Sequence, residues 1–222
     1  GNPLLPEVAE LAGSSAAVLS GAVGGPKWDD PAASMHPEDG LLQLRAQLGV
    51  FANIRPVKVY PKLTDSSVLK PEVLSGVDMV VVRELTGGLY YAEPKGRNQT
   101  PQGWTGVDTM RYSENEIERV LRVGFELARG RRKKLASVDK ANVLECSRLW
   151  RQKAIELSEE YTDVEVEHIL VDACEMQLVQ QPSRFDVIVS ANTLGDILTD
   201  GVCGLEAFMV FFHWQTLSDV LE

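Results

Sequence analysis

The stretch VSANTLGDILTDG, residues 189–201, decides the fold. It overlaps the apolar run DVIVSAN (186–192), which is typical of a strand buried on both faces, and it continues with the spacing of a helix. Asp196 and Asp200 stand one helical turn apart and therefore share one face of that helix. Two carboxylates on one face repel each other unless a positive charge lies beside them. The stretch thus predicts a strand that leads into a helix, with a cationic group at the junction.

Strand and helix patterns alternate through most of the chain. Ser113 and Glu116 have the spacing of a capping box at the start of a long helical pattern. Loops rich in Pro and Gly are expected at 24–40 and 93–106. Strand-like runs occur at 16–23, 57–60, 77–84, 135–140, 164–171 and 186–192, with helical patterns at 40–49, 111–130, 141–161 and 172–180. This order predicts an α/β fold with an open sheet.

Length and composition limit the class of protein. The 222 residues are 44% hydrophobic, which is enough for one large or two small globular domains. With 22 Lys and Arg against 32 Asp and Glu, the net charge of −10 argues against nucleic acid or an anionic membrane surface as the partner. The longest apolar run, 207–214, is too short to cross a bilayer.

The cysteines indicate the redox environment. Cys146, Cys174 and Cys203 are odd in number and lie within helical or strand-like patterns. Reduced thiols are therefore expected rather than a disulfide framework. Because no signal peptide pattern is visible either, the sequence predicts a cytoplasmic location, with an organelle matrix such as that of a plastid as the alternative.

Acidic residues follow two of the predicted strands. Asp172 comes at the end of the strand-like run at 164–171, and Asp196 and Asp200 come after the run at 186–192. Ligands of open α/β sheets bind outside the carboxyl ends of the strands. Three carboxylates are the hard oxygen ligands that Mg²⁺ or Mn²⁺ prefers, so the sequence predicts a metal site. The alternative is that acids near a helix N-terminus only interact favourably with the helix dipole.

Three arginines provide positive charge that a ligand could use. Arg45 stands in a helical pattern, and Arg55 stands at the start of an extended segment. Arg83 closes an apolar strand, where an unpaired charge would be costly. Planar guanidinium groups suit a dicarboxylate ligand. The alternatives are that Arg45 and Arg55 are ordinary surface residues, and that Arg83 pairs with Glu84 or another neighbouring acid.

Five segments between about residues 16 and 200 carry a resemblance to a known family. They are GAVGGPKWD, LRAQLGVFANIRPVKVYP, VVVRELTGGLYYAEPKG, SVDKANVLE and VDACEMQLVQQPSRFDVIVSANTLGDILTD. In this order they resemble the 3-isopropylmalate dehydrogenases of the isocitrate/isopropylmalate dehydrogenase family. The motif RELTGGLY separates the chain from the isocitrate branch, where Leu-Thr-Gly is typically Asn-Thr-Glu. The resemblance implies NAD-dependent oxidative decarboxylation of 3-isopropylmalate to 4-methyl-2-oxopentanoate in leucine biosynthesis, with Mg²⁺ or Mn²⁺.

The resemblance assigns roles to the residues that would touch the substrate, a 2-hydroxy diacid. Arg45, Arg55 and Arg83 match the arginines that bind the malate carboxylates. Leu41 with Leu42 matches the helix segment that contacts the isopropyl group, a task that suits apolar side chains.

It also implies the catalytic and cofactor-binding residues. Tyr90 matches the tyrosine that protonates the enolate after CO₂ loss, and Lys140 matches the general base on the C2 hydroxyl. Asn142 and Asn192 match polar residues near the substrate and the NAD cofactor. Without the resemblance, Tyr90 would be read as an interfacial tyrosine in a hairpin and Lys140 as a solvated lysine.

The metal site and the assembly are linked by the same resemblance. Asp172, Asp196 and Asp200 match the metal ligands, and Asp172 also matches a substrate-binding position. In the family, Lys140 and Asp172 are contributed across a dimer interface, so we expect a homodimer with a composite active site. The segment LVDACEMQLV, residues 170–179, is also too apolar for the surface of a monomer.

The expected domain organisation follows from the matched segments. Residues 1–50 are expected to form part of a first, cofactor-side domain, and 51–206 a nearly complete second domain with the substrate and metal site and the dimer interface. Residues 207–222 are expected to form a divergent tail. The Gly-rich first turn and the later adenosine loop of the family are not recognised in the sequence, so we expect weak NAD binding.

Two other functions stay open at this point. One is a non-catalytic truncated subunit that only dimerises or binds substrate. The other is a related dehydrogenase that acts on another 2-hydroxy diacid, such as tartrate or homoisocitrate. The apolar Leu41 and Leu42 favour isopropylmalate over these diacids.

Overall fold

The chain divides into two compact units. The computed structural model describes residues 2–28, 30, 33, 35–60, 64, 69–203 and 215–218. The first unit comprises Gly1–Phe51 and Leu217–Glu222, and the second comprises Ala52–Thr216. Within the described residues, no helix has the length and apolar character needed to span a membrane. Of the predicted tail 207–222, only 215–218 lie among the described residues.

The first unit holds α1 (Pro6–Gly13), the short helix η1 (Pro26–Trp28) and α2 (Pro37–Leu48). α2 confirms the helical pattern predicted at 40–49. At its start the Asp39 carboxylate accepts a hydrogen bond from the His36 backbone N–H at 2.7 Å. It ends at Gly49, whose φ of 63° is the left-handed conformation that glycine adopts most easily.

The strand predicted at 16–23 is not present, and this prediction was wrong. These residues form no regular structure, and the side chains of Val18, Leu19 and Val23 are exposed. Apolar composition alone does not make a strand, because its backbone groups need a neighbouring strand to pair with. Among the described residues none pairs with this segment.

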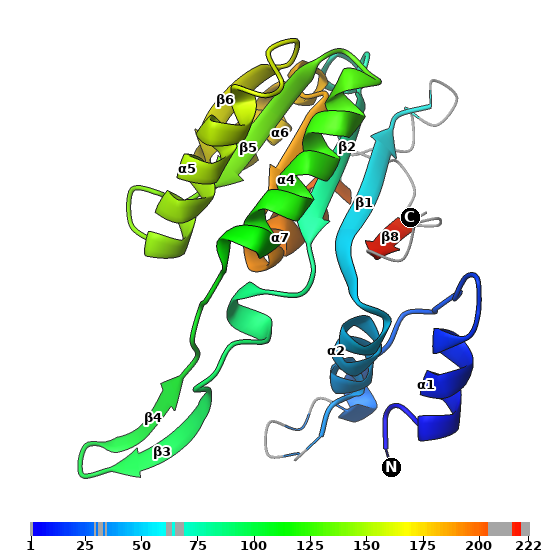
Figure 1. Cartoon of the computed structure of the whole chain (residues 1–222), viewed down its shortest axis with the longest axis vertical. Helices are drawn as coiled ribbons and strands as arrows, with labels where there is room; N and C mark the ends of the chain where they lie inside the picture. Colours follow the sequence, from blue (N-terminus) through cyan, green and yellow to red (C-terminus); the bar gives the residue numbers. More distant parts are fainter. Residues whose placement is uncertain are drawn as a thin grey trace. The chain divides into compact units, whose positions relative to one another are not determined.

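A six-stranded sheet organises the second unit (Figure 1). The strand order is β6-β5-β7-β2-β1-β8. Strands β6, β5, β7 and β2 run parallel to one another, and β1 runs antiparallel to β2. The strands are β1 (Val50–Lys58), β2 (Asp78–Glu84), β5 (Lys134–Asp139), β6 (Glu165–Leu170), β7 (Val187–Ser190) and β8 (Gln215–Ser218). The predicted open α/β sheet is therefore confirmed.

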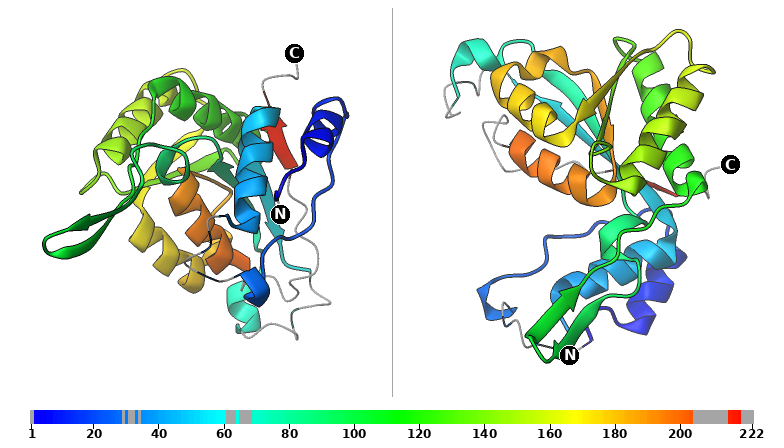
Figure 2. Two further views of the ribbon diagram at one scale, coloured as in Figure 1. Left: turned by 90° about the horizontal axis from the view of Figure 1, so that it is seen from below. Right: turned by 90° about the vertical axis from the view of Figure 1, so that its left-hand side faces the viewer.

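Helices cover both faces of the sheet (Figure 2). One face packs against α4 (Glu114–Arg129) and α5 (Glu145–Ser158), and the other against α6 (Val171–Gln180) and α7 (Asn192–Cys203). The remaining short helices are α3 (Pro71–Leu74), η3 (Gly88–Tyr90) and η4 (Pro182–Arg184). Because both faces are covered, β2 and β7 are buried at almost every position.

The longest helix, α4, forms as its sequence predicts. Ser113 and Glu116 form the capping box, with the Glu116 carboxylate accepting from the Ser113 N–H at 2.7 Å. Gly124 lets the helix approach the sheet, because a Cβ there would lie 3.2 Å from that of Val189. The apolar side of the helix is fully buried at Ile117, Val120, Leu121 and Phe125, whereas Leu127 is only partly buried.

A hydrophobic core lies between the sheet and the helices α6 and α7. The strands contribute Met79, Val81, Val138, Ile169 and Ile188, and the helices contribute Cys174, Leu178, Leu198 and Val202. Burying such apolar side chains away from water provides most of the stabilisation that holds α7 against β2.

A β-hairpin replaces the loop predicted at 93–106. Its strands β3 (Gly96–Thr100) and β4 (Gly103–Val107) form a separate two-stranded sheet (Figure 1). Pro101 and Gln102 form the turn, and Gly103 has a φ of 109°. Because nearly every residue of this ribbon is exposed, its sequence carries no alternation of apolar and polar residues, and the periodicity missed it.

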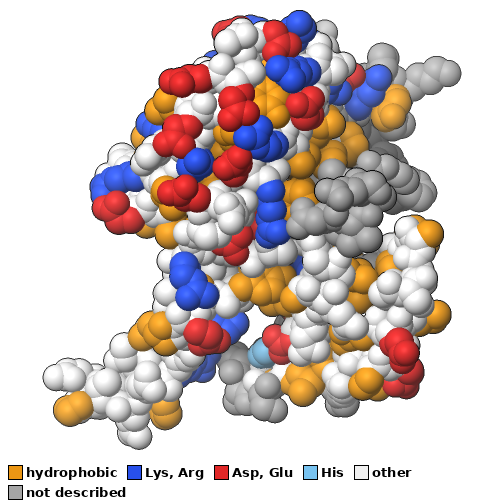
Figure 3. All heavy atoms as spheres, in the orientation of Figure 1, with side chains coloured by type: hydrophobic (Ala, Val, Ile, Leu, Met, Phe, Trp, Pro, Cys, Tyr) orange, Lys and Arg blue, Asp and Glu red, His pale blue; other side chains and the backbone are white. Residues whose placement is uncertain are grey.

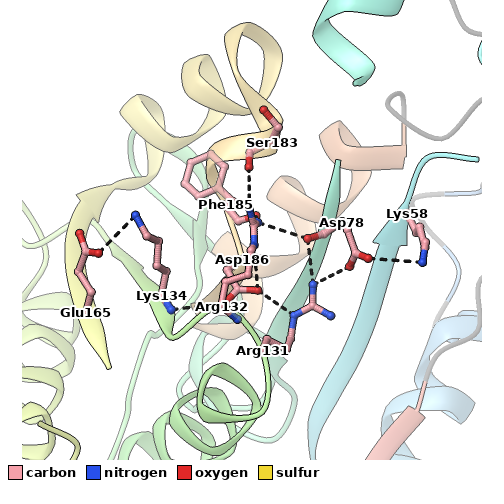
Figure 4. A network of polar contacts seen from close by, with 9 residues as sticks. All are labelled: Lys58, Asp78, Arg131, Arg132, Lys134, Glu165, Ser183, Phe185 and Asp186. Carbon is pink, nitrogen blue, oxygen red and sulfur yellow. Dashed lines mark hydrogen bonds and ion pairs between the residues drawn. The ribbon is translucent and has the colours of Figure 1, made fainter. Parts of the chain in front are cut away.

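A polar cluster ties together the amino ends of the parallel strands (Figure 4). The fully buried Asp186 carboxylate accepts hydrogen bonds from the Arg131 Nε at 2.9 Å and the Arg132 N–H at 2.7 Å. Arg131 also donates to the Asp78 carboxylate at 2.6 Å, which lowers the pKa of that acid. Every charge at the centre of this cluster is paired, so it acts as a structural clamp between α4, β2 and β7.

Candidate active site

The carboxyl ends of the parallel strands lie at one edge of the sheet, as predicted. Ser190 of β7 is level with both Arg83 of β2 and Val138 of β5, and Asp139 of β5 is level with Leu170 of β6. The candidate residues at or just after these strand ends therefore start from the same edge. This is the edge at which open α/β sheets bind ligands.

Arg83 is buried at this edge and fully engaged. Its side chain is 3% exposed. Its Nε donates to the Asn192 carbonyl oxygen at 3.0 Å, and its Nη2 donates to the Asn192 Oδ1 at 2.8 Å. Its Nη1 contacts the Asp196 Oδ1 directly. The pairing with Glu84 considered from the sequence is therefore replaced by a pairing with an acid on α7.

Arg55 approaches the same acid from β1. Its side chain is 4% exposed, so the interpretation as a surface residue was wrong for Arg55. Its Nη2 lies 3.8 Å from the Asp196 Oδ1. Its Nε donates to the Asn53 Oδ1 at 2.6 Å, and its Nη1 bonds to the Thr199 Oγ1. The sequence did not indicate Thr199, because it lies 144 positions from Arg55 along the chain.

Tyr90 completes the group around Asp196. It lies on η3, and its hydroxyl donates a hydrogen bond to the Asp196 Oδ2 at 3.0 Å. Burial and the Asp196 carboxylate both raise the pKa of this hydroxyl. The Arg83 guanidinium carbon lies 5.8 Å from the centre of the Tyr90 ring. The cationic group expected beside Asp196 is thus formed by Arg83 and Arg55, with Tyr90 on the other carboxylate oxygen.

Asp196 and Asp200 are accessible enough to meet a metal ion. The Asp196 side chain is 34% exposed, and Asp200, one turn later on α7, is exposed. Their carboxylates are hard oxygen donors, the chemistry that Mg²⁺ or Mn²⁺ requires. Among the described residues, however, no group of three or more acidic, His or Cys side chains is close enough to hold a metal. The part of the chain that the structure describes therefore does not form a complete set of metal ligands by itself.

Asp172 and Lys140 form a separate pair. The Lys140 Nζ donates to the Asp172 Oδ1 at 2.6 Å, and this contact lowers the pKa of Asp172. Asp172 is largely exposed. Asp139, which directly precedes Lys140, is buried. Its carboxylate accepts hydrogen bonds from the Arg151 Nε at 2.8 Å and from the Ala141 N–H at 2.9 Å. This fixes the turn after β5 and presents Lys140 at the sheet edge.

The two asparagines predicted near the cofactor have different surroundings. Asn142 lies in the turn after β5 and is exposed. Asn192 is fully buried, and its Nδ2 donates to the Gly87 carbonyl oxygen at 3.1 Å while its Oδ1 accepts from Arg83. Direct contact between the Asn192 side chain and a cofactor would require these bonds to break. The structure therefore favours a role in holding Arg83.

The remaining predicted residues lie in the first unit. Leu41, Leu42 and Arg45 are all on α2, and each is partly buried. Arg45 stands in the last turn of that helix, where a positive charge interacts favourably with the helix dipole. Their roles toward the substrate stay predictions.

The face over α4 and α5 offers no comparable site. Figure 3 shows positive and negative side chains interspersed there. Arg122, for example, contacts Glu118 at 2.7 Å and Glu160 at 2.8 Å. Exposed pairs of this kind contribute little to stability and leave no excess charge for a ligand.

The chain belongs to the isocitrate/isopropylmalate dehydrogenase family. The family model, described as isocitrate/isopropylmalate dehydrogenase, matches residues 1–209. The chain is 59% identical to a 3-isopropylmalate dehydrogenase of Dehalococcoides mccartyi over 99% of its own length, and 54% identical to one of Aquifex aeolicus over 90%. It spans 60% of the first relative and 55% of the second.

Solved structures agree with this assignment. The TT0538 protein from Thermus thermophilus superimposes with a TM-score of 0.75 and 32% identity, covering 91% of this chain and 38% of the other. An isocitrate dehydrogenase from Methylococcus capsulatus has a TM-score of 0.66 and 38% identity, covering 74% of this chain and 47% of the other.

Proposed function

We propose that this chain provides the substrate and metal site of a 3-isopropylmalate dehydrogenase of leucine biosynthesis. The reaction is the oxidative decarboxylation of 3-isopropylmalate to 4-methyl-2-oxopentanoate, with NAD as hydride acceptor and Mg²⁺ or Mn²⁺. The observation that carries the proposal is the convergence of two buried guanidinium groups, Arg55 and Arg83, on Asp196 beside the Tyr90 hydroxyl. The relatives named 3-isopropylmalate dehydrogenase support the choice of substrate.

The arginines are suited to bind the substrate carboxylates. Burial strengthens the attraction between a guanidinium group and an anion, because little water screens it. Asp196 now occupies part of the hydrogen-bonding capacity of Arg83. A bound dicarboxylate would share or replace this contact. Arg45, Leu41 and Leu42 on α2 are the other residues proposed to bind the substrate. The apolar leucines support isopropylmalate over tartrate or homoisocitrate.

The metal would be held by carboxylates from two chains. Asp196 and Asp200 provide the pair on α7, and Asp172 of the partner subunit would provide the third ligand. A bound divalent cation supplies polarisation of the C2 oxygen of the substrate. Asn142 is exposed and would contact NAD directly. Asn192 would act by holding Arg83 instead.

Tyr90 and Lys140 would move the protons. In the overall reaction C2 loses a hydride and its hydroxyl proton, and the bond between C3 and its carboxylate breaks to release CO₂. Lys140 of the partner subunit would take the hydroxyl proton. A tyrosine hydroxyl carries its proton at neutral pH, and burial and Asp196 raise the pKa of Tyr90 further; Tyr90 would donate this proton to C3 of the enolate.

Exposed apolar side chains support a homodimer. Met176 and Val179 lie one turn apart on α6 and are largely exposed, as is Ile197 on the adjacent α7. Trp104 on the β3–β4 hairpin is also exposed, and an isolated two-stranded ribbon is marginally stable by itself. A second copy of the chain would cover these surfaces and bring Lys140 and Asp172 to the other site.

The location and the non-catalytic alternative are also proposals. Cys146 and Cys174 are free thiols, which supports a reducing compartment such as the cytoplasm. A chain that binds substrate and dimerises without turnover is supported by the engaged Asn192 side chain, which offers NAD no direct contact.

Binding measurements test the proposal. The chain is titrated with 3-isopropylmalate in the presence and absence of Mn²⁺ by calorimetry, and NADH formation is followed by absorbance. We expect binding that needs Mn²⁺ and that is at least about tenfold tighter than binding of tartrate, a difference of roughly 1.4 kcal/mol. Binding without NADH formation would favour the non-catalytic alternative, and no binding with Mn²⁺ would exclude the proposed substrate site.

A further inference from the structure

Two consecutive residues at the end of β2 point to opposite faces of the sheet. Arg83 faces α7, where it meets Asp196. Glu84 faces the other side, where it meets Tyr112 just before α4. Successive side chains of a strand alternate in this way. The segment from Glu84 to Tyr90, named here the Glu84–Tyr90 turn, thus begins beside one candidate site residue and ends at another.

Glu84 fixes the start of this turn. Its side chain is fully buried, and its Oε1 accepts hydrogen bonds from the Thr86 N–H at 2.7 Å and the Thr86 Oγ1 at 2.8 Å. Its Oε2 accepts from the Gly87 N–H at 2.9 Å and from the Tyr112 hydroxyl at 3.2 Å. Burial raises the pKa of Glu84, and these hydrogen bonds oppose that rise.

The Tyr112 ring fits closely against two glycines of the turn. A Cβ at Gly87 would lie 2.5 Å from its Cε1, and a Cβ at Gly88 would lie 2.5 Å from its hydroxyl oxygen. On its other side the ring makes an edge contact with Trp150, with centroids 6.4 Å apart. The ring is therefore held in one place, and any shift of the turn would have to move it.

The Tyr112 hydroxyl also reaches the start of α7. It accepts a hydrogen bond from the Asn192 N–H at 2.9 Å. Asn192 in turn binds the Gly87 carbonyl oxygen and the Arg83 guanidinium. One buried hydroxyl thus joins the start of the Glu84–Tyr90 turn to the first residue of α7, while the Tyr90 hydroxyl joins the end of the turn to Asp196.

We propose that Tyr112 is a positioning residue for the site. Its hydroxyl locks the Glu84–Tyr90 turn to the first residue of α7, and so sets the places of Arg83 and Tyr90 relative to Asp196. The inference rests on the proposed function for what Arg83 and Tyr90 then do. The lock itself is a property of the ligand-free chain and can be measured without any ligand.

Tyr112→Phe removes the lock while keeping the ring. The buried Asn192 N–H then loses its acceptor and the Glu84 Oε2 loses a donor, so both segments should open more often. The matched control is Tyr161→Phe. Tyr161 is equally buried, and its ring stacks on that of Phe125 with centroids 4.5 Å apart. It lies before β6, near the amino ends of the strands, and therefore away from the site.

Hydrogen exchange of the ligand-free chain measures the lock. In Tyr112→Phe, amides of the Glu84–Tyr90 turn and of the first turn of α7 should exchange at least about tenfold faster, because both hydrogen bonds of the Tyr112 hydroxyl are lost. Tyr161→Phe should leave both segments unchanged. Unchanged exchange in Tyr112→Phe would overturn the inference, as would acceleration spread evenly over the sheet.

Calorimetry with Mn²⁺ and 3-isopropylmalate measures the consequence. Tyr112→Phe should bind about tenfold more weakly than the unmodified chain, whereas Tyr161→Phe should bind with unchanged affinity. Equal affinity in Tyr112→Phe and the unmodified chain would overturn the positioning role. If the unmodified chain does not bind 3-isopropylmalate, the proposed function fails, and hydrogen exchange alone still decides on the lock.

A second variant covers the case in which Tyr112→Phe does not fold. Glu84→Gln reaches the same link from its other end, because an amide nitrogen in place of one carboxylate oxygen faces hydrogen-bond donors. It should accelerate exchange in the same two segments. Acceleration in the turn alone, with α7 unaffected, would overturn the proposed link through Tyr112.

Discussion

The Tyr90 hydroxyl donates a hydrogen bond to the Asp196 carboxylate at 3.0 Å, although the two residues are 106 positions apart. Tyr90 is the proposed proton donor, and Asp196 is a proposed metal ligand. The carboxylate that would face the metal therefore also holds the proton that would be donated. Its second oxygen is held by Arg83, so one side chain links the three proposed tasks of the site.

The first prediction concerns the metal ligands. Asp200→Asn should weaken Mn²⁺ binding at least about tenfold, or roughly 1.4 kcal/mol, because it replaces a charged oxygen ligand by a neutral one. Calorimetry measures the affinity. Asp163→Asn is the control, since this exposed acid pairs with Arg129 at 3.0 Å near the amino ends of the strands. Equal Mn²⁺ affinities in the two variants would show that Asp200 is not a metal ligand.

The second prediction concerns the guanidinium group of Arg83. Arg83→Lys keeps the charge but cannot reproduce the bonds to both the carbonyl and the side-chain oxygen of Asn192. The Asn192 oxygens would then lack hydrogen-bond donors in a buried place. This should lower the free energy of unfolding by about 1–3 kcal/mol. Urea unfolding measures the loss. Arg122→Lys on the exposed face of α4 should cost much less, and equal losses would contradict this account.

The third prediction concerns the pH dependence of stability. Contact with Arg131 lowers the pKa of Asp78 below its ordinary value of 3.8. The stabilisation is therefore fully present above the unfolded pKa and is lost as the pH falls through the lower, folded pKa. Asp78→Asn should be less stable than the unmodified chain near neutral pH, by at most about 1 kcal/mol because the acid is half exposed.

Thermal unfolding across the acidic range checks the sign of this effect. The difference between Asp78→Asn and the unmodified chain should shrink as the pH falls below about 4, the ordinary range of an aspartate. A difference that stays constant between neutral and strongly acidic pH would show that the substitution acts through packing and not through the charge.

The general fold could be predicted because its elements are locally coded. The strands β2, β5 and β7 contain apolar runs, and the capping box of α4 lies within four residues. The position of the site at the strand ends followed from the same order. The sequence could thus indicate which edge carries the chemistry before any distance was known.

The partners within the site could not be predicted from local patterns. Arg83 and Asp196 are 113 positions apart, and Tyr112 and the Asn192 N–H are 80 apart. Periodicity says which face a residue takes, but not which distant residue meets it there. The predictions for the segment at 16–23 and for the β3–β4 hairpin were wrong for another reason. Pairing with a neighbouring strand, and not composition, decides whether a segment becomes a strand.

The fourth prediction concerns the dimer surface. Met176→Glu places a charge on the exposed apolar face of α6, and burying it against a second copy would be costly. Sedimentation at micromolar concentration should show a dimer for the unmodified chain and a monomer for this variant. Ile155→Glu on α5, which is also exposed, should remain dimeric. Dissociation of both variants would place the interface elsewhere.

The last prediction tests whether one site uses two chains. Within one chain the described residues do not bring three possible metal ligands together, and Asp172 contacts Lys140 instead of Asp196. In a composite dimer, Asp172 of one chain would complete the pair on α7 of the other. Homodimers of Asp172→Ala should therefore lack the complete Mn²⁺ site, and so should homodimers of Asp196→Ala. Mixing the two variants gives heterodimers in which one of the two sites again has all three carboxylates. With random pairing, half of the dimers are heterodimers, so calorimetry of the mixture should recover about a quarter of the Mn²⁺ sites of the unmodified chain. A mixture that binds no more Mn²⁺ than the separate variants would mean that all ligands of a site come from a single chain.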